Sequence, residues 1–316
     1  WRRFVWISPA YRMGIELIEK HDIDLVYSSS SPPASAIIAS RLKKKCKVKW
    51  VAEFRDAWSL NPYNTRSKLG HYLECKYEKK ILSNAEALVT VSQPIAKELT
   101  DMHNKPCHVI FNAYDKQDYN STEKIRRDKF TIVHTGSIYP GKRDPGALFQ
   151  ALSELMEVEP SIADFVEVNL YGNRQERLLS PVVQKLGVEG MVNFKGGVSK
   201  TESILAQQKA TLLLLLTWNS KIAEGTLTGK LFEYIASTRP ILALSYPGVI
   251  KEVLEKDNLG IVTNDSEEIK KFLQAAIASW KSGDMTLGGY NQKLDSREKY
   301  SWNHQVAKLN AIFETK

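Results

Sequence analysis

A glycine-rich segment in the second half of the chain leads into a predicted helix that carries a lysine and a glutamate three residues apart. Gly229 precedes Lys230, and Glu233 lies on the same helix face because residues at i and i+3 are neighbours there. One cation for a phosphate group and one carboxylate for vicinal hydroxyl groups are what a nucleotide requires. The alternative is an ordinary surface ion pair, which contributes less than about 1 kcal/mol, and the spacing on its own favours that alternative.

A second candidate segment follows a strand predicted at residues 130–134. Gly136 and Gly141 would let the backbone approach a ligand closely, and Pro145 suits the first turn of the next helix. Lys142 and Arg143 then lie beside a helix N-terminus, where a phosphate group would also meet backbone N–H groups. The segment is a candidate pyrophosphate-binding loop, although a glycine-rich turn with two surface bases is common.

A third candidate lies in the first half of the chain, where a strand predicted at residues 48–54 runs into the sequence Arg55-Asp56-Ala57-Trp58. Loops that follow the strands of a parallel sheet face its ligand sites. Arg55 or Asp56 could therefore contact a sugar hydroxyl or an acceptor. Either side chain could equally cap a helix or join a buried salt bridge.

The cysteines carry no metal-binding or redox motif. Cys46, Cys75 and Cys107 are odd in number and have no metal-ligand or Cys-x-x-Cys spacing. The sequence also has no cluster of His, Cys and Asp with ligand spacing, so it predicts no metal site. This cysteine usage fits a reducing compartment without a disulfide framework. We therefore expect a cytoplasmic protein, either free or associated with the inner face of the membrane.

The elements that position these residues belong to a chain of two-domain length. Its 316 residues are 43% apolar and 25% charged, which excludes the collagenous, disulfide-scaffold and largely disordered classes. The longest apolar run, residues 212–216 with their flanks, is about half as long as a membrane-spanning helix requires. A strand buried on both faces of a parallel sheet accounts for that run.

Short β-branched runs alternate with amphipathic stretches along the whole chain, the pattern of parallel βαβ units. In the first half, strands are predicted at 24–27, 48–54, 87–91 and 108–110, and helices at 34–44, 69–82 and 94–102. A polar segment at 116–128 is the predicted linker. Strands then follow at 130–134, 166–171, 192–194, 211–216, 241–244 and 260–262, with helices at 145–156, 199–208, 230–237 and 302–313. The predicted fold class is α/β, with two doubly wound, Rossmann-like domains facing a cleft.

The basic residues are concentrated in the first half. The chain has 44 Lys and Arg against 36 Asp and Glu, a net charge of +8, and residues 1–125 carry 20 basic and 14 acidic side chains. The densest basic feature, at residues 41–49, lies where a predicted helix ends, so its cations could simply complement the helix dipole. The other interpretation is a peripheral contact with an anionic membrane or a phosphorylated substrate. Nucleic acid is not an expected partner.

An ordered set of motifs along nearly the whole chain resembles the GT-B glycosyltransferases, in particular the retaining group called glycosyltransferase family 4. Its specificity comes from the order and spacing of the motifs more than from any one of them. The motifs in the first half are Asp24–Tyr27 with Ser31-Pro32-Pro33, Phe54–Trp58, Val89–Ser92 and Ile110–Asp115. Those in the second half are Gly136–Lys142, Tyr171–Asn173, Phe194–Gly196, Gly229–Tyr234 with Pro240, and Tyr300–Trp302.

The resemblance implies a GT-B fold and the transfer of a sugar, with retained anomeric configuration, from a nucleoside-diphosphate sugar to a saccharide or lipid-linked acceptor. The setting would be the synthesis of cell-surface polysaccharide or glycolipid. It assigns Glu233 to the ribose, and Lys142 and Lys230 to the donor diphosphate, which gains negative charge as it leaves. Lys142, Lys230 and Asp56 are the catalytic candidates, and Gly136, Ser137, Arg143, Gly172, Glu224, Gly229 and Glu233 are the donor-binding candidates. The donor is a substrate, and neither a cofactor nor a metal is implied.

Several positions depart from the family pattern. Ser137 stands where family members often have arginine, and Arg143 could supply that charge. Glu224 and Glu233 have eight residues between them where seven are usual, so the role of Glu224 stays open. Only one helix precedes the strand at 24–27, where several strands and a glycine-rich loop are usual. We therefore expect the first domain to lack segments.

The expected domains are residues 1–122 on the acceptor side, residues 123–298 on the donor side, and residues 299–316, a helix that crosses back to the first domain. Two other functions stay open. A GT-B sugar-nucleotide epimerase would need acid and base carboxylates and histidines at the anomeric centre, and only His134 lies in a candidate loop. A non-catalytic module that binds nucleotide sugars would fit the departures from the family pattern at Ser137 and Gly225.

Overall fold

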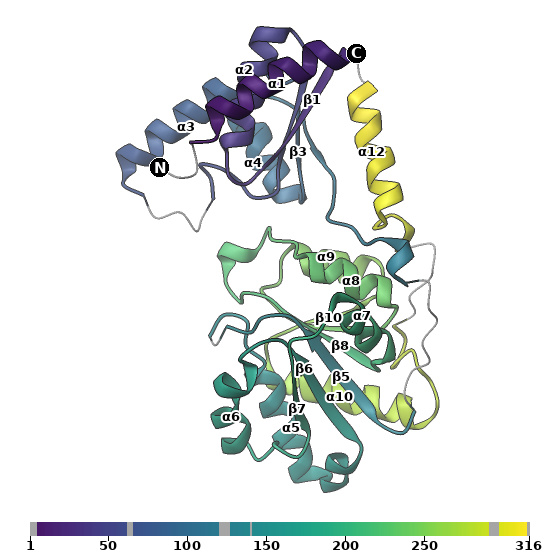
Figure 1. The fold of residues 1–316 in the computed structure, drawn as a ribbon. Helices are drawn as coiled ribbons and strands as arrows, with labels where there is room; N and C mark the ends of the chain where they lie inside the picture. Colours follow the sequence, from purple (N-terminus) through teal and green to yellow (C-terminus); the bar gives the residue numbers. More distant parts are fainter. Residues whose placement is uncertain (1–4, 62–65, 120–126, 140, 291–296, 315–316) are drawn as a thin grey trace. The chain divides into compact units, whose positions relative to one another are not determined.

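The structure is a computed structural model, and it describes residues 5–61, 66–119, 127–139, 141–290 and 297–314. The chain divides into two compact units, Trp1–Phe111 with Gln305–Lys316, and Asn112–His304. Each unit contains one parallel β-sheet with helices packed on it (Figure 1). The predicted α/β class with two Rossmann-like sheets is therefore confirmed. The domain boundary predicted between residues 122 and 123, and most of the predicted linker, lie outside the described residues.

The first unit is built on a four-stranded sheet of order β1-β2-β3-β4. All neighbouring pairs are parallel. Its strands are β1 (Leu25–Ser30), β2 (Lys49–Phe54), β3 (Ala87–Thr90) and β4 (Cys107–Val109). Its helices are α1 (Ile7–His21), α2 (Ala34–Cys46), α3 (Lys68–Leu82) and α4 (Gln93–His103). Trp50, Phe54 and Leu88 are fully buried in the core between this sheet and its helices.

The last helix, α12 (Trp302–Glu314), completes the first unit. Partly buried Leu309, Ile312 and Phe313 pack against Val51 and Val89 on the sheet. The buried side chain of Gln305 accepts a hydrogen bond of 2.9 Å from the backbone N–H of Phe111 through its Oε1. The apolar face of this helix therefore has a defined place on the sheet.

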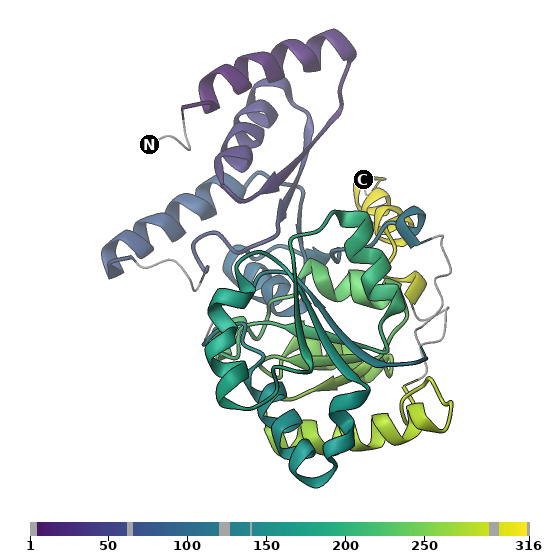
Figure 2. The same cartoon turned by 60° about the horizontal axis from the view of Figure 1, so that its bottom comes forward.

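The second unit is built on a six-stranded parallel sheet of order β10-β9-β8-β5-β6-β7. Its strands are β5 (Phe130–Thr135), β6 (Val166–Tyr171), β7 (Val192–Gly196), β8 (Leu212–Leu216), β9 (Ile241–Leu244) and β10 (Gly260–Val262). Its helices are α5 (Gly146–Val158), α6 (Gln175–Lys185), α7 (Lys200–Lys209), α8 (Gly229–Ser237), α9 (Val249–Lys256) and α10 (Ser266–Lys281). Figures 1 and 2 show these helices covering both faces of the sheet.

The five leucines of β8 occupy an interior strand of this sheet, between β9 and β5, and all five are buried. A strand covered on both faces by helices has no polar side, so its sequence is continuously apolar. The expectation of a buried strand at this run is confirmed. Within the described residues, no helix is both long and apolar enough to cross a bilayer.

The basic segment at residues 41–49 joins the end of α2 to β2. Lys43 forms an ion pair with Glu86, whose other carboxylate oxygen accepts a hydrogen bond from the backbone N–H of Trp50. Lys47, in the left-handed conformation, ends the helix with its N–H bonded to the carbonyl of Lys43. At least part of this segment therefore fixes the connection between helix and strand.

Candidate functional site

In the second unit, the order in which strands are added to the sheet reverses between the neighbouring strands β5 and β8. The chain proceeds from β5 through β6 to β7 on one side, and from β8 through β9 to β10 on the other. Loops leaving β5 and β8 therefore diverge at their carboxyl ends, and open α/β sheets bind ligands at such a point.

A cavity of about 320 Å³ lies at the carboxyl ends of β5, β6 and β7. It is lined by the residues that follow these strands and by the first turns of α7 and α8. Of the residues predicted from the sequence, it brings together Gly136, Ser137, Gly172, Lys230 and Glu233. The remaining lining residues are Thr135, Tyr171, Asn173, Gly197, Val198, Ser199, Lys200 and Ser203.

Backbone contacts between the strand-end loops explain the glycines at this cavity. The N–H of Gly136 donates to the carbonyl of Tyr171 at 2.9 Å, and the N–H of Gly172 donates to the carbonyl of Gly196 at 2.8 Å. A Cβ atom at position 172 would overlap the carbonyl oxygen of Gly136 and the side-chain amide of Gln175. Gly172 therefore allows two loops to run in direct contact at the cavity floor.

Lys230 and Glu233 form the charged edge of the cavity. Their Nζ and Oε2 atoms are 2.7 Å apart, and both side chains are about one-third exposed, at 36% and 30%. Thr228 caps α8 by accepting a 3.0 Å hydrogen bond from the N–H of Lys230. This cap fixes where the helix begins, and so places both side chains on its first turns. The pair is accessible to a ligand and carries both charges that a nucleotide requires.

Buried polar side chains support the charged edge of the cavity from the interior of the second unit. The amide of Gln207, which is fully buried, donates to Oγ1 of Thr135 at 3.0 Å and lies 3.3 Å from Oε2 of Glu233. The hydroxyl of Tyr234 accepts from the N–H of Thr135 at 2.9 Å. Burial raises the pKa of Tyr234 to about 12, so this hydroxyl stays protonated. These bonds connect α7 and α8 to the end of β5.

His134 is a buried neutral imidazole beside the same loop. Its Nδ1–H donates to the carbonyl of Leu214 at 2.9 Å. Burial, opposed by this hydrogen bond and helped by the nearby charges of Lys230 and Arg143, lowers its pKa to about 4. Its Nε2 has no hydrogen-bond partner among the described residues, and a Cβ at Gly136 would come within 3.4 Å of it. His134 therefore packs behind Gly136 as a neutral imidazole.

The residues of the predicted pyrophosphate-binding loop line two different cavities. Lys142 lines a separate cavity of about 340 Å³ together with Gly141 and Asp144, and its Nζ lies 4.4 Å from the centre of the Trp218 ring. The carboxylate of Asp144 accepts from the N–H groups of Gly141 and Gly146, at 2.8 and 2.9 Å, which shapes the turn. The structure thus separates Lys142 from the cavity of Lys230.

Arg143, the other predicted cation of this loop, lines neither the cavity of Lys142 nor the cavity of Lys230. Its guanidinium lies over the ring of Tyr139, 5.6 Å from the ring centre. Its charge contributes to the lowered pKa of His134, and its buried Nε has no hydrogen-bond partner among the described residues. Arg143 is therefore a cation of this loop, close enough to His134 to affect its pKa, whose Nε is not used in a hydrogen bond with any described residue.

Three other predicted residues do not line the cavity of Lys230. Glu224 ends a short 3₁₀ helix, η3 (Lys221–Ala223), and its carbonyl accepts from the N–H of Val249 while its side chain is exposed. Gly229 is the first residue of α8 and is exposed. Asp56 belongs to the first unit, where it is exposed on the loop after β2.

The loop that carries Asp56 is anchored by the residues that follow it. The indole Nε1 of Trp58 donates to Glu74 at 2.8 Å, and the N–H of Ser59 donates to Glu78 at 2.8 Å. Glu78 is fully buried and lies 3.2 Å from Nε2 of His103. The loop is therefore anchored by buried Trp58 and Ser59, while the carboxylate of Asp56 is exposed.

Sequence reasoning missed several residues of the cavity, mainly those after β7. Ser199 caps α7 and forms a reciprocal capping box with Glu202, and Lys200 and Ser203 lie at the start of this helix. The Ser-x-x-Glu pattern at 199–202 marks the start of a helix directly after a strand. That pattern could have placed Lys200 and Ser203 at the carboxyl edge of the sheet.

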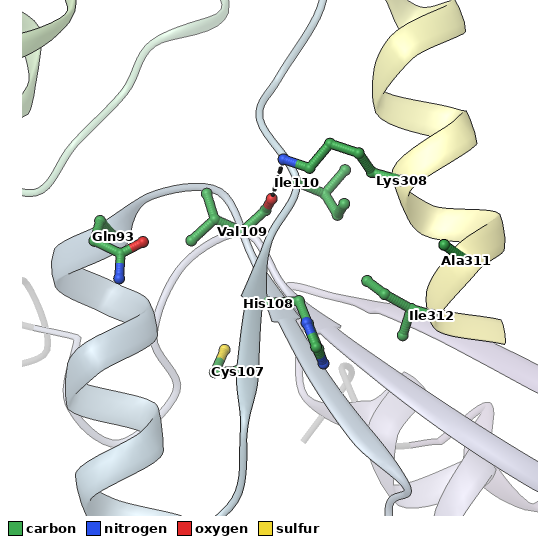
Figure 3. A pocket seen from close by; sticks show the side chains of 8 residues that line it. All are labelled: Gln93, Cys107, His108, Val109, Ile110, Lys308, Ala311 and Ile312. Atoms are coloured by element: carbon green, nitrogen blue, oxygen red, sulfur yellow. Dashed lines mark hydrogen bonds between the residues drawn. The ribbon is translucent and has the colours of Figure 1, made fainter. Parts of the chain in front are cut away.

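A larger cavity, of about 580 Å³, lies within the first unit beside β4 and α12 (Figure 3). The ammonium of Lys308 is bonded there to the carbonyl of Val109 at 3.0 Å. Burial raises the pKa of Cys107 to about 12, so its thiol is not a nucleophile. No carboxylate is among the described residues that line it, so it lacks the pairing of charges found at Lys230 and Glu233.

Solved structures define the class of fold. The chain resembles HepE (Alr3699) of Anabaena, solved in complex with UDP, at 16% identity and a TM-score of 0.72, covering 96% of this chain and 82% of that one. It resembles the sucrose-phosphate synthase (tll1590) of Thermosynechococcus elongatus at 14% identity and a TM-score of 0.65, covering 98% and 78%. A putative UDP-N-acetylglucosamine 2-epimerase of Listeria monocytogenes aligns at 13% identity and a TM-score of 0.58, covering 98% and 78%. The protein has a glycosyltransferase-like GT-B fold.

The family comparison adds the sequence evidence. Residues 2–118 match the family model for Glycosyltransferase Family 4. The resemblance to this family that the motifs indicated is thereby confirmed over the first unit. A comparison with curated protein sequences finds no match.

Proposed function

We propose that the protein is a retaining glycosyltransferase that uses a nucleoside-diphosphate sugar as donor and binds it in the cavity at the ends of β5, β6 and β7. The single observation that carries the proposal is the exposed Lys230–Glu233 pair, with Nζ and Oε2 2.7 Å apart, at the edge of that cavity. Glu233 would accept hydrogen bonds from the ribose hydroxyls. Lys230 would leave the carboxylate to meet the diphosphate.

The chemistry follows from where charge develops. When the bond between sugar and diphosphate breaks, the leaving nucleoside diphosphate gains negative charge, and a fixed cation stabilises that state more than the ground state. Lys230 and the N–H groups of the first turn of α8 supply positive potential at this edge. Arg143, which has an uncommitted Nε, would add a second cation where Ser137 has none.

Several finer assignments remain part of the proposal. Lys142, which lines a separate cavity, would contribute less to holding the diphosphate than Lys230, and Asp56 would contact the transferred sugar or the acceptor. The acceptor would be a saccharide or a lipid-linked saccharide, in the synthesis of cell-surface polysaccharide or glycolipid. Catalysis would need neither a metal nor a cofactor, because lysine and arginine side chains would carry the charge.

A thermal-shift panel of UDP, GDP, ADP and their sugars tests the proposal. A ligand present at about 100 times its dissociation constant stabilises the folded state by about 2.7 kcal/mol, so the correct nucleotide should raise the melting temperature. UDP deserves first place in the panel because HepE, of similar fold, was solved with it. The same shift in the Glu233→Gln variant, or no shift with any nucleotide, would contradict the proposal.

Turnover assays separate the proposal from the two other functions. A transferase should release nucleoside diphosphate from its donor sugar, slowly to water and faster with an acceptor. An epimerase would instead convert the sugar of the donor without releasing the diphosphate, which NMR of the sugar detects. A binding module would do neither and would still give the thermal shift.

A further inference from the structure

Helix α3 of the first unit leaves large apolar side chains exposed in its N-terminal half, although Ile81 and Leu82 at its C-terminal end are buried in the core. Leu69, Tyr72 and Leu73 are exposed to 68%, 61% and 55%. Glu78, on the other side of the helix, is fully buried. In a surface helix of a globular unit the apolar stripe ordinarily faces the core, so exposed leucine and tyrosine side chains on this helix are unusual.

The inward side is fixed by specific bonds, so α3 cannot rotate to bury its apolar residues. Glu74 accepts a 2.8 Å hydrogen bond from Nε1 of Trp58 and forms an ion pair with Arg66. Glu78 accepts a 2.8 Å hydrogen bond from the N–H of Ser59 and lies 3.2 Å from Nε2 of His103. Turning the helix would leave these carboxylates without their partners, which is strongly unfavourable for a buried charge.

The outward side is positively charged as well as apolar. Exposed lysines flank Leu69, Tyr72 and Leu73, namely Lys68, Lys76, Lys79 and Lys80. Both acidic residues of the fully described helix Lys68–Leu82 lie on the inward side, so nothing on the outward side offsets the lysines. In Figures 1 and 2 the N-terminal turns of α3 project from the rest of the first unit.

We propose that the outward face of α3 binds the surface of an anionic phospholipid bilayer. Leucine and tyrosine would enter the boundary between headgroups and acyl chains, while the lysines would meet the headgroup phosphates. A helix with aromatic and leucine residues on one face and lysines beside them is typical of such interfacial binding. The proposal does not depend on the nucleotide cavity of the second unit.

The lysines on the outward face of α3 favour a lipid bilayer over a second protein as its binding partner. Protein interfaces are depleted in lysine at their centres, whereas here Lys76 and Lys80 lie among the apolar residues of the stripe. A lysine with a long flexible stem can keep its ammonium at the headgroups while the neighbouring side chains enter the boundary. The basic segment at the end of α2 is less suited, because Lys43 is paired with Glu86 and the segment fixes the connection between α2 and β2.

The test is co-sedimentation with vesicles of phosphatidylcholine alone and of phosphatidylcholine with phosphatidylglycerol, at low and high salt. The unaltered chain should bind the anionic vesicles, and salt should weaken binding. Replacing Lys76, Lys79 and Lys80 by Gln should reduce affinity by about fivefold per lysine, roughly a hundredfold in all. Leu69→Ser with Leu73→Ser should also reduce affinity, with the thermal stability unchanged because both side chains are exposed.

Matched variants identify the surface. Lys44→Gln with Lys45→Gln removes exposed charge from the end of α2, and Val158→Ser removes a side chain of the second unit that is 74% exposed. Neither variant should change vesicle binding, because neither alters the outward face of α3. Equal losses in the α2 and α3 variants, no binding to anionic vesicles, or a change of oligomeric state in the α3 variants in place of a change in sedimentation would each overturn the proposal.

Discussion

Glu233 and Lys230 meet at 2.7 Å on the first turns of α8, with their side chains about one-third exposed at the edge of the strand-end cavity. An exposed pair of this kind contributes at most about 1 kcal/mol to folding. The small contribution of this pair to the stability of the fold therefore does not explain why a cation and a carboxylate lie at this edge. A nucleotide, which has both phosphate and hydroxyl groups, gives both residues a partner.

Replacing Glu233 by Gln should weaken nucleoside-diphosphate binding by about tenfold or more. The carboxylate would lose charge-assisted hydrogen bonds to the ribose, worth roughly 1.5–3 kcal/mol, while the amide keeps the size of the side chain. Isothermal titration calorimetry measures the change. Glu255→Gln, which breaks the surface pair of Lys251 and Glu255 on α9, is the matched control. Unchanged nucleotide affinity in Glu233→Gln would remove the ribose assignment.

Removing the cations tests which of them stabilises the leaving diphosphate. Lys230→Ala should lower kcat more than it weakens binding of the nucleoside alone, because the charge is needed most as the diphosphate leaves. Arg143→Ala should cause a loss of similar size if its guanidinium takes the place of a charge at Ser137. Lys142→Ala should cause a smaller loss than Lys230→Ala, since Lys142 lines a separate cavity over Trp218. Wild-type kinetics in Arg143→Ala would make it a structural residue.

The glycine at position 172 can be tested apart from any ligand. Gly172→Ala should destabilise the second unit by about 1–3 kcal/mol, because the new Cβ would overlap the carbonyl oxygen of Gly136 and force the loops apart. Chemical denaturation measures this change. Gly190→Ala is the control, since a Cβ there meets no atom within 4 Å. Equal stability of the two variants would mean that the loops separate without strain.

His134 predicts a pH dependence of stability with a definite sign. Its pKa is about 4 in the folded protein, below the ordinary value of 6.5. Between these values the unfolded chain binds a proton that the folded protein does not, so stability falls as the pH decreases through this window. The linkage amounts to about 2 kcal/mol between pH 7 and pH 5.

The variant His134→Asn isolates that contribution, because an amide can donate to the carbonyl of Leu214 without titrating in this range. Urea denaturation of both proteins at several pH values gives the difference in unfolding free energy. The advantage of the wild type over His134→Asn should shrink as the pH falls from 7 to 5. Parallel pH profiles would show that His134 does not carry this linkage.

The fold followed from the sequence wherever local patterns and burial agreed. The runs at 166–171, 241–244 and 260–262 form strands with the predicted bounds, because β-branched and leucine residues flanked by turn residues leave a buried strand as the favoured structure. The helices α6, α9 and α10 were not predicted. Pro181 lies inside α6, although a proline usually marks the end of a helix, and α9 has only eight residues.

The site was predictable at its glycines and charges and less so in its three-dimensional grouping. Gly136, Gly172, Lys230 and Glu233 share the cavity because the carboxyl ends of parallel strands meet at one edge of the sheet. Lys142 does not join them, because Asp144 bonds to two backbone N–H groups and directs the turn toward Trp218. Such a bond between side chain and backbone leaves no periodic signal in the sequence. Neither does the buried amide of Gln207, which lies between Thr135 and Glu233.

A crystal structure of the protein with UDP, or with whichever nucleotide gives the largest thermal shift, would locate the donor site. We expect the nucleotide in the cavity at the ends of β5, β6 and β7, with ribose hydroxyls bonded to Glu233 and the diphosphate beside Lys230 and the first turn of α8. A nucleotide bound in the cavity of Lys142, or in the cavity beside β4 and α12, with Glu233 and Lys230 still paired to each other, would contradict it.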